Sequence, residues 1–352
     1  MRRRRARLVM AVVLLVLPLF AGELLIRGLV LLGRLPEAPA YERPFEVSWR
    51  NYHLAWPVDI LIIGDSMTEH AVPPAVLDEG LASRLGHPVT SYNLASSGAD
   101  FKVNRAVIDA LIREHRLPPV VLIGVSPPSL TGKDTFETVF APSPMGSRIA
   151  GCGWATTPED WLSCQLTQVS DLWAWRGEPS RVAQAFVSAM PRTLPGPGSP
   201  LQMDGYRPGA PATQSRLDQE MAILDAGSPG DFQLGPTAEA DLLAMVSAIR
   251  AAGSTAIGFT IPHSPPLLSS LVARHADWDI LRRAAVARLA SESGIPIIDV
   301  DAFGTWWKPQ DSRDPIHLSR LGGPLFTKQL MGTAPFVTDL AAALQREGLA
   351  AR

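Results

Sequence analysis

Five short apolar runs that alternate with helical patterns are the feature of this sequence that most constrains its fold. The runs are rich in β-branched residues and nearly continuous in apolar side chains, at 58–63, 89–94, 119–125, 255–261 and 295–300. Strands covered on both faces show this pattern, whereas half-exposed strands alternate apolar with polar residues. The helical patterns lie at 73–85, 100–115, 237–252 and 279–293. The alternation predicts an α/β fold, with a parallel sheet of about five strands and helices on both faces.

Residues 126–254, between the third and fourth runs, form too long a segment for a simple crossover. The segment holds both cysteines, and its tryptophans predict a helix: Trp154, Trp161, Trp173 and Trp175. Residues 191–211 are rich in proline and glycine with little periodicity, so we expect them to be irregular. We interpret 126–254 as an insertion over one edge or face of the sheet, within an α/β domain that spans 58–352.

The first 34 residues differ from the rest of the chain. Five arginines lie within residues 2–7, and the apolar stretch from Leu8 to Gly33 is interrupted by Glu23 and Arg27, which can pair on one helix face. A basic start before an apolar core is typical of an export signal or a membrane anchor. Its 26 residues suffice to cross the ~30 Å hydrocarbon core of a bilayer. We expect residues 1–34 to be a retained single-pass anchor with its N-terminus in the cytoplasm; a cleaved signal peptide is the alternative.

Both interpretations of the N-terminus place the remaining chain outside the cytoplasm of a bacterial-type cell. Residues 35–57, punctuated by prolines, are then expected to be an extended linker. Cys152 and Cys164 lie 12 positions apart, and thiols in exported proteins tend to oxidise. We expect them to form a disulfide, with two unpaired buried cysteines as the alternative.

The distribution of charge along the chain limits the classes of substrate and partner that we expect. The total of −2 hides a charge of +6 on residues 1–34, from seven arginines and one glutamate, which leaves −8 on the remaining chain. An acidic domain is a poor match for nucleic acid or other polyanions and fits a neutral glycan or ester better. The sequence has no metal-ligand spacing of histidines and no phosphate-binding glycine loop, so no metal or cofactor is expected.

Candidate catalytic residues follow the first and fifth predicted strands. Ligands of an open parallel sheet bind beyond the carboxyl ends of its strands. Ser66 follows the first strand, and Asp314 and His317 lie beyond the fifth. Serine is a poor nucleophile until a base removes its proton, and the base needs a carboxylate to hold its tautomer. A hydroxyl, an imidazole and a carboxylate at one edge therefore predict nucleophilic acyl transfer.

This constellation resembles the SGNH (GDSL-type) hydrolase superfamily. The resemblance rests on Gly-Asp-Ser at 64–66, Gly98 and the Asp-x-x-His motif at 314–317, and covers roughly 58–125 and 255–333. It implies a flavodoxin-like fold with Ser66 as nucleophile, His317 as base and Asp314 as the residue that orients it. It also implies that the backbone N–H groups of Ser66 and Gly98 belong to an oxyanion hole.

The block after the third strand departs from the family pattern. Ser126 stands where the family has an asparagine that donates to the oxyanion, so a serine hydroxyl would have to supply the third donor. Membrane-anchored members that take part in O-acylation of extracellular polymers are similar in plan, with an anchor, a linker and a variant SGNH domain.

Other polar and aromatic residues near these motifs have weaker functional interpretations. Glu69 and His70, next to the nucleophile, could tune it or bind substrate, but solvated polar residues in a mobile loop are the simpler interpretation. Trp306 and Trp307 could stack on a sugar face or, equally, pack beneath the loop. His263 could line the pocket, although a loop histidine without a partner is the simpler interpretation.

The sequence favours serine-dependent acyl-ester chemistry outside the cytoplasm, as an O-acyltransferase or esterase acting on a cell-surface or secreted polysaccharide. A secreted lipase or esterase for small or lipid esters is one alternative. Another is a non-catalytic SGNH-derived scaffold that partners a membrane-embedded acyltransferase. The expected partners are therefore an acylated or acyl-accepting substrate and the membrane, and nucleic acid is not among them.

Overall fold

The structure, a computed structural model, describes residues 2–32, 35, 43–131, 135–176, 179, 182–183, 202–226, 232–261, 263–300 and 307–346. The strands and helices that it describes follow in this order: α1 (Arg2–Leu31), α2 (Arg43–Ala55), β1 (Ile60–Ile63), α3 (Ser66–Ala71), α4 (Pro74–Leu85), β2 (Ser91–Asn93), α5 (Phe101–Arg113), β3 (Val120–Val125), α6 (Pro127–Thr131), η1 (Phe136–Phe140), α7 (Pro144–Ala150), α8 (Pro158–Val169), α9 (Asp171–Ala174), α11 (Gln214–Ala226), α12 (Ala238–Ala251), β4 (Thr255–Thr260), α13 (Pro265–Arg274), α14 (Trp278–Ser293), β5 (Ile297–Ile298), η3 (Pro309–Asp311), α15 (Gly322–Gly332) and α16 (Ala334–Arg346).

The chain divides into two compact units. The larger unit comprises Val47–Phe136 and Gly198–Arg352 and contains the whole sheet. The smaller unit comprises Met1–Glu46 and Glu137–Pro197, and its described elements are helical. The division of the sequence at 34/35 and 57/58 stays a prediction.

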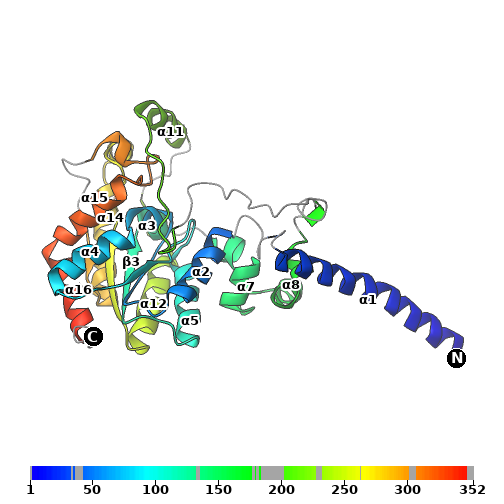
Figure 1. The fold of residues 1–352 in the computed structure, drawn as a ribbon. Helices are drawn as coiled ribbons and strands as arrows, with labels where there is room; N and C mark the ends of the chain where they lie inside the picture. The colour runs from blue at the N-terminus through cyan, green and yellow to red at the C-terminus, as the bar shows by residue number, and fades with distance from the viewer. Residues whose placement is uncertain are drawn as a thin grey trace. The chain divides into compact units, whose positions relative to one another are not determined.

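A parallel sheet of five strands, in the order β2-β1-β3-β4-β5, forms the centre of the larger unit (Figure 1). Ile60 of β1 is opposite Ser91 of β2 on one side and Val120 of β3 on the other. This order is that of flavodoxin-like doubly wound folds, in which the first strand lies between the second and third. The predicted α/β class, with a parallel sheet of about five strands, is confirmed, and each observed strand lies within one of the predicted apolar runs.

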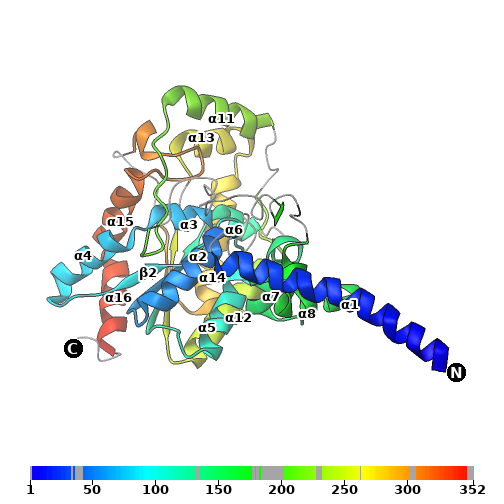
Figure 2. The same cartoon turned by 45° about the vertical axis from the view of Figure 1, so that its right-hand side comes forward.

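Helices cover both faces of the sheet. Figure 2 shows α4, α15 and α16 on one side and α5 and α12 on the other. All residues of β1 and β3 are buried, as continuous apolar runs require. Ile60, Ile62 and Phe259 join side chains of α4, α15 and α16 in one apolar core. This core holds the strands at a fixed spacing. The candidate site lies at the carboxyl ends of these strands.

Helix α2 corrects the prediction of an extended linker over residues 35–57. Tyr52 is fully buried, and its hydroxyl donates to the carbonyl of Arg116 at 2.6 Å. Of the four prolines that suggested extended chain, Pro44 lies in the first helical turn and Pro57 just beyond the last helical residue. A helix tolerates proline at both places because no internal N–H bond is lost there. Residues 36–42 of the predicted linker lie outside the described residues.

In the smaller unit, α1 packs on α9 through its C-terminal half. Glu23 pairs with Arg27 at 2.6 Å, as the four-residue spacing predicts, and it accepts hydrogen bonds from the N–H groups of Asp171 and Leu172 at 3.1 and 2.9 Å. Among the described residues, no helix combines the length and the apolar character needed to cross a bilayer. The predicted anchor is not confirmed.

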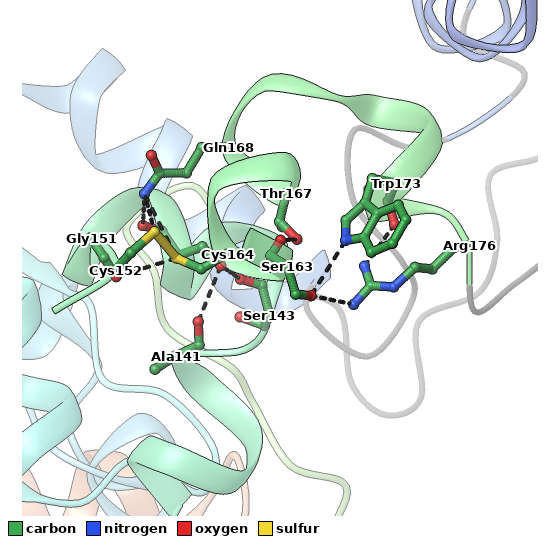
Figure 3. The surroundings of a disulfide bond; sticks show 11 residues. Ala141, Ser143, Gly151, Cys152, Ser163, Cys164, Thr167, Gln168, Trp173 and Arg176 are labelled. Carbon is green, nitrogen blue, oxygen red and sulfur yellow. Dashed lines mark hydrogen bonds between the residues drawn. A yellow bond between two sulfur atoms is a disulfide. The ribbon is translucent and has the colours of Figure 1, made fainter. Parts of the chain in front are cut away.

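Cys152 and Cys164 form a disulfide in the smaller unit, with their Cα atoms 5.7 Å apart (Figure 3). Gln168 lies beside the sulfur atoms, and its Nε2 donates to the carbonyl of Ser147 at 2.9 Å. The bond joins the start of the turn after α7 to helix α8. The structure thus brings together the two cysteines that the sequence pairs.

Candidate active site

Ser66 begins α3 directly after β1, at the carboxyl edge of the sheet. Asp65 caps the helix, because its Oδ1 accepts from the N–H groups of Met67 and Thr68 at 3.0 and 3.4 Å. Gly64 makes the sharp turn possible, since a Cβ there would lie 2.1 Å from the hydroxyl of Thr68. Ser66 is half-buried between the buried residues Asp65 and Met67. The local sequence therefore presents the Ser66 hydroxyl at the sheet edge.

The structure brings Ser66, His317 and Asp314 into one hydrogen-bonded row. The Oγ of Ser66 lies 2.8 Å from Nε2 of His317. The Nδ1 of the same ring lies 2.9 and 2.8 Å from the two carboxylate oxygens of Asp314. An ionised carboxylate accepts only, so Nδ1 carries the proton and Nε2 is free to accept from Ser66. This is the arrangement that a serine nucleophile needs.

Asp314 is held in its ionised form. Burial opposes ionisation, but hydrogen bonds from the side chain and backbone N–H of His317 and from the N–H of Ile316 outweigh it and lower the pKa of Asp314. The backbone donors lie 2.8 and 2.9 Å from Oδ1. The three-residue spacing thus lets one carboxylate accept from both the backbone and the ring of the same histidine.

Two backbone N–H groups are available near the nucleophile. The N–H groups of Ser66 and Gly98 have no hydrogen-bond partner within the described part of the chain. Gly98 is exposed and has a φ of +80°, which favours glycine. Its loop is tied to the nucleophile turn, because the N–H of Ser96 donates to the carbonyl of Gly64 at 3.1 Å. Both groups proposed from the sequence therefore remain free to donate to an oxyanion.

Ser126 has a different task from the one that the family pattern implies. It is fully buried, and its hydroxyl donates to the carboxylate of Asp65 and lies 3.2 Å from that of Ser129. Burial raises the pKa of Asp65, and the hydrogen bond from Ser126 opposes this effect. The structure corrects the expectation for Ser126: its hydroxyl supports the residue that caps α3 and is not a free oxyanion donor.

Glu69 and His70 are buried on α3, which corrects the expectation of solvated residues in a mobile loop. Glu69 accepts from the hydroxyl of Ser97 at 2.7 Å and forms an ion pair with Arg207 at 3.4 Å. Burial raises the pKa of Glu69, although Arg207 and Ser97 act in the opposite direction. The sequence offered one usable signal, since residues three and four positions after Ser66 share its helix face.

His70 is neutral and makes contacts on both sides of its ring. Its Nδ1–H donates to the carbonyl of Arg207, and its Nε2 accepts from Nη1 of Arg313 at 2.7 Å. Burial lowers its pKa to about 3, and the positive charges of Arg313 and Arg207 act in the same direction. The rings of His70 and His317 meet edge to face with their centroids 5.4 Å apart.

Of the weaker sequence candidates, the structure describes His263 and Trp307, and both pack against other side chains. His263 is buried against Trp278, with ring centroids 5.6 Å apart, and its Nδ1 has no partner among the described residues. Trp307 packs against the core, and its Nε1 donates to the hydroxyl of Ser312 at 3.1 Å, which favours packing over sugar stacking. Trp306 lies outside the described residues. In the described ranges, no group of three or more His, Cys, Asp or Glu side chains could hold a metal.

Comparisons with known proteins do not assign the chain to a family. No family model matches it, and no curated protein does. Among solved structures it is similar to one titled "Crystal Structure of TesA", at 13% identity and a TM-score of 0.34, over 79% of this chain and 98% of that chain. A likeness at this level carries no argument, so the interpretation of the site rests on its geometry.

Proposed function

We propose that this protein carries out serine-dependent acyl-ester chemistry. The observation that supports the proposal is the continuous row of Asp314, His317 and Ser66 at the carboxyl edge of a parallel sheet, with contacts of 2.8–2.9 Å. Nδ1 of His317 faces the carboxylate of Asp314 and Nε2 faces the hydroxyl of Ser66, which is the orientation that nucleophilic acyl transfer requires.

In the proposed reaction, Nε2 of His317 takes the proton of Ser66 as Oγ attacks the carbonyl carbon of an ester. The negative charge moves to the carbonyl oxygen, where the N–H groups of Ser66 and Gly98 would stabilise it. His317 then returns the proton to the leaving alkoxide, and an acyl-serine remains. Water or a sugar hydroxyl then gives its proton to His317 and attacks the acyl carbon. The bond between the acyl carbon and Oγ breaks, and His317 returns the proton to Oγ of Ser66, which restores the free enzyme. Throughout, Asp314 stabilises the imidazolium.

The proposed substrate is an acylated or acyl-accepting polysaccharide outside the cytoplasm. The disulfide supports an oxidising compartment, and the charge of −8 on residues 35–352 favours a neutral glycan over a polyanion. Retention of residues 1–34 at the membrane is part of the same proposal. A secreted esterase is the alternative if that segment is removed, and the intact mass of the exported protein would distinguish the two.

A scaffold without activity is the second candidate, because the hydroxyl of Ser126 is used elsewhere and leaves only the N–H groups of Ser66 and Gly98 as assigned oxyanion donors. Losing one such donor costs ~10²–10³ in rate and does not by itself abolish catalysis. The intact triad therefore favours the enzyme.

The test uses the full-length protein with 4-nitrophenyl acetate and a serine-directed phosphonate. We expect turnover by the wild type, phosphonate labelling at Ser66, and loss of both in Ser66→Ala. Ser247→Ala, which alters an exposed serine on α12, is the matched control and should behave as wild type. Equal activity in the wild type and Ser66→Ala would exclude the serine mechanism.

A further inference from the structure

Two ionisable side chains that the proposed chemistry does not use lie three and four positions after the nucleophile on α3. Glu69 is 3% exposed and His70 is 1% exposed. A buried ionisable group is unfavourable unless it is paired, and an apolar side chain would fill the same space without that cost. The contacts of this pair therefore point to a task beyond packing.

The side chain of Glu69 forms a hydrogen bond to the loop that carries Gly98, whose N–H is one of the proposed oxyanion donors. Its Oε2 accepts from the hydroxyl of Ser97 at 2.7 Å, and Ser97 directly precedes Gly98. On its other side, Oε1 faces Nη1 of Arg207 at 3.4 Å, in an ion pair with both side chains buried. Arg207 thus holds the carboxylate of Glu69, and this carboxylate in turn holds Ser97, the residue before Gly98.

The side chain of His70 forms a hydrogen bond to the loop that carries Asp314 and His317. Its Nε2 accepts from Nη1 of Arg313 at 2.7 Å, and Arg313 directly precedes Asp314. The Nδ1–H of His70 is engaged by the carbonyl of Arg207, so the ring cannot turn without losing a bond on each side. His70 follows Ser66 by four positions on the same helix, and Ser66 contacts His317 of that loop.

We propose that Glu69 and His70 are positioning residues of the acyl-transfer reaction. Glu69 holds the 96–98 loop so that the N–H of Gly98 meets the oxyanion, and His70, through Arg313, sets the place of Asp314 and His317 relative to Ser66. The proposal rests on the proposed function. Within two helical turns, helix α3 thereby connects Ser66 to the 96–98 loop and to the loop that carries Asp314 and His317.

The first arm of the test removes the contact to the oxyanion loop. Ser97 is exposed, so Ser97→Ala should fold normally. We expect kcat for 4-nitrophenyl acetate to fall about tenfold, less than the loss of a whole donor, with KM changed less than about twofold. Glu69→Gln keeps one oxygen that can accept from the hydroxyl of Ser97 and should lose less, and the double variant should lose no more than Ser97→Ala alone, because the two residues act through one contact.

The second arm removes the contact to the acid–base loop. Arg313→Ala should lower kcat about tenfold without moving KM, and Arg313→Lys should recover part of the loss. Nε of Arg313 also lies 3.9 Å from Oδ2 of Asp314. His70→Leu leaves that ion pair in place, so it should lower kcat less than Arg313→Ala does and add little to it in the double variant. Arg346→Ala, at an exposed residue near the end of α16, is the matched control and should behave as wild type.

The outcomes separate this proposal from the proposed function. Unchanged kcat in Ser97→Ala and Arg313→Ala, with phosphonate labelling at Ser66 intact, would overturn the positioning role and leave the serine mechanism standing. Equal activity of the wild type and Ser66→Ala would overturn both. If His70→Leu fails to fold, Arg313→Ala and Arg313→Lys decide the second arm.

Discussion

At the scale of single residues, the neighbours of each ionisable group set its charge, and its charge sets what it can do. Asp314 is surrounded by donors and stays ionised, so it can hold the proton-bearing Nδ1 of His317. His70 lies 5.4 Å from the same ring, centroid to centroid, yet burial keeps it neutral. Two adjacent histidines thus have different roles because one faces a carboxylate and the other a guanidinium.

Replacing Asp314 should test whether this carboxylate fixes the proton on Nδ1 of His317, apart from any role in holding the ring in place. Asp314→Asn nearly conserves shape but offers Nδ1 an amide, so the ring loses the partner that fixes its proton. We expect kcat to fall about 10³–10⁴-fold, measured with 4-nitrophenyl acetate. The control is Asp109→Asn, at a half-buried carboxylate on α5 that pairs with Arg105, which should leave kcat unchanged. A fall of less than tenfold in Asp314→Asn would contradict the role of this carboxylate.

His70 should make the folded state sensitive to acid. Its pKa is about 3 in the folded protein and about 6.5 in the unfolded chain. Between these values the unfolded state binds a proton that the folded state does not. Stability therefore falls as pH drops through that window, by up to about 1.4 kcal/mol per pH unit. Denaturant unfolding from pH 7 to 4 should give a shallower pH dependence for His70→Gln than for the wild type, and parallel curves would disprove the assignment.

At the scale of elements, the same turn that ends β1 also begins the nucleophile helix. Asp65 caps α3, and Ser126, at the end of β3, donates to the cap. The first and third strands are neighbours in the sheet, so the residue after one can support the residue after the other. The family pattern gives the position of Ser126 the role of an oxyanion donor, whereas in this protein Ser126 stabilises the start of α3.

Ser126→Ala distinguishes these two roles. Removing the hydroxyl leaves the buried carboxylate of Asp65 short of a donor, which should cost about 1–3 kcal/mol in the free energy of unfolding. If Ser126 donated to the oxyanion, kcat would fall ~10²–10³. We expect the loss in stability, measured by denaturant unfolding, with kcat lowered less than tenfold. An unchanged stability with a hundredfold fall in kcat would restore the family role.

At the scale of the whole molecule, the disulfide and the candidate site belong to different units. Both cysteines lie in the smaller unit, whereas the triad lies in the larger one. The larger unit contains no cysteine, so its core of strands and helices does not depend on a covalent link.

Reducing the disulfide should therefore destabilise one unit and spare the chemistry. Closing a loop of this length contributes about 3 kcal/mol in the chain-entropy model. We expect Cys152→Ser/Cys164→Ser to increase proteolysis within 137–176 while turnover of 4-nitrophenyl acetate stays within twofold of wild type. Loss of turnover on reduction would show that the two units depend on each other.

The sequence by itself predicted the features that depend on local order along the chain. Continuous apolar runs reveal strands buried on both faces, and α4, α5, α12 and α14 lie within two residues of their predicted bounds. The order of Ser66, Asp314 and His317 placed three reactive groups at one sheet edge, because parallel strands end on the same side.

Only the tertiary structure decided which side chains meet across the chain. The contact of Ser126 with Asp65 joins residues 61 positions apart, and that of Arg313 with His70 joins residues 243 apart. Periodicity reports the face on which a residue lies but not the partner that packing brings to that face. Sequence alone therefore predicts Glu69 and His70 in solvent and an extended linker over 35–57. The structure instead buries Glu69, His70 and Tyr52 against segments far away in the sequence.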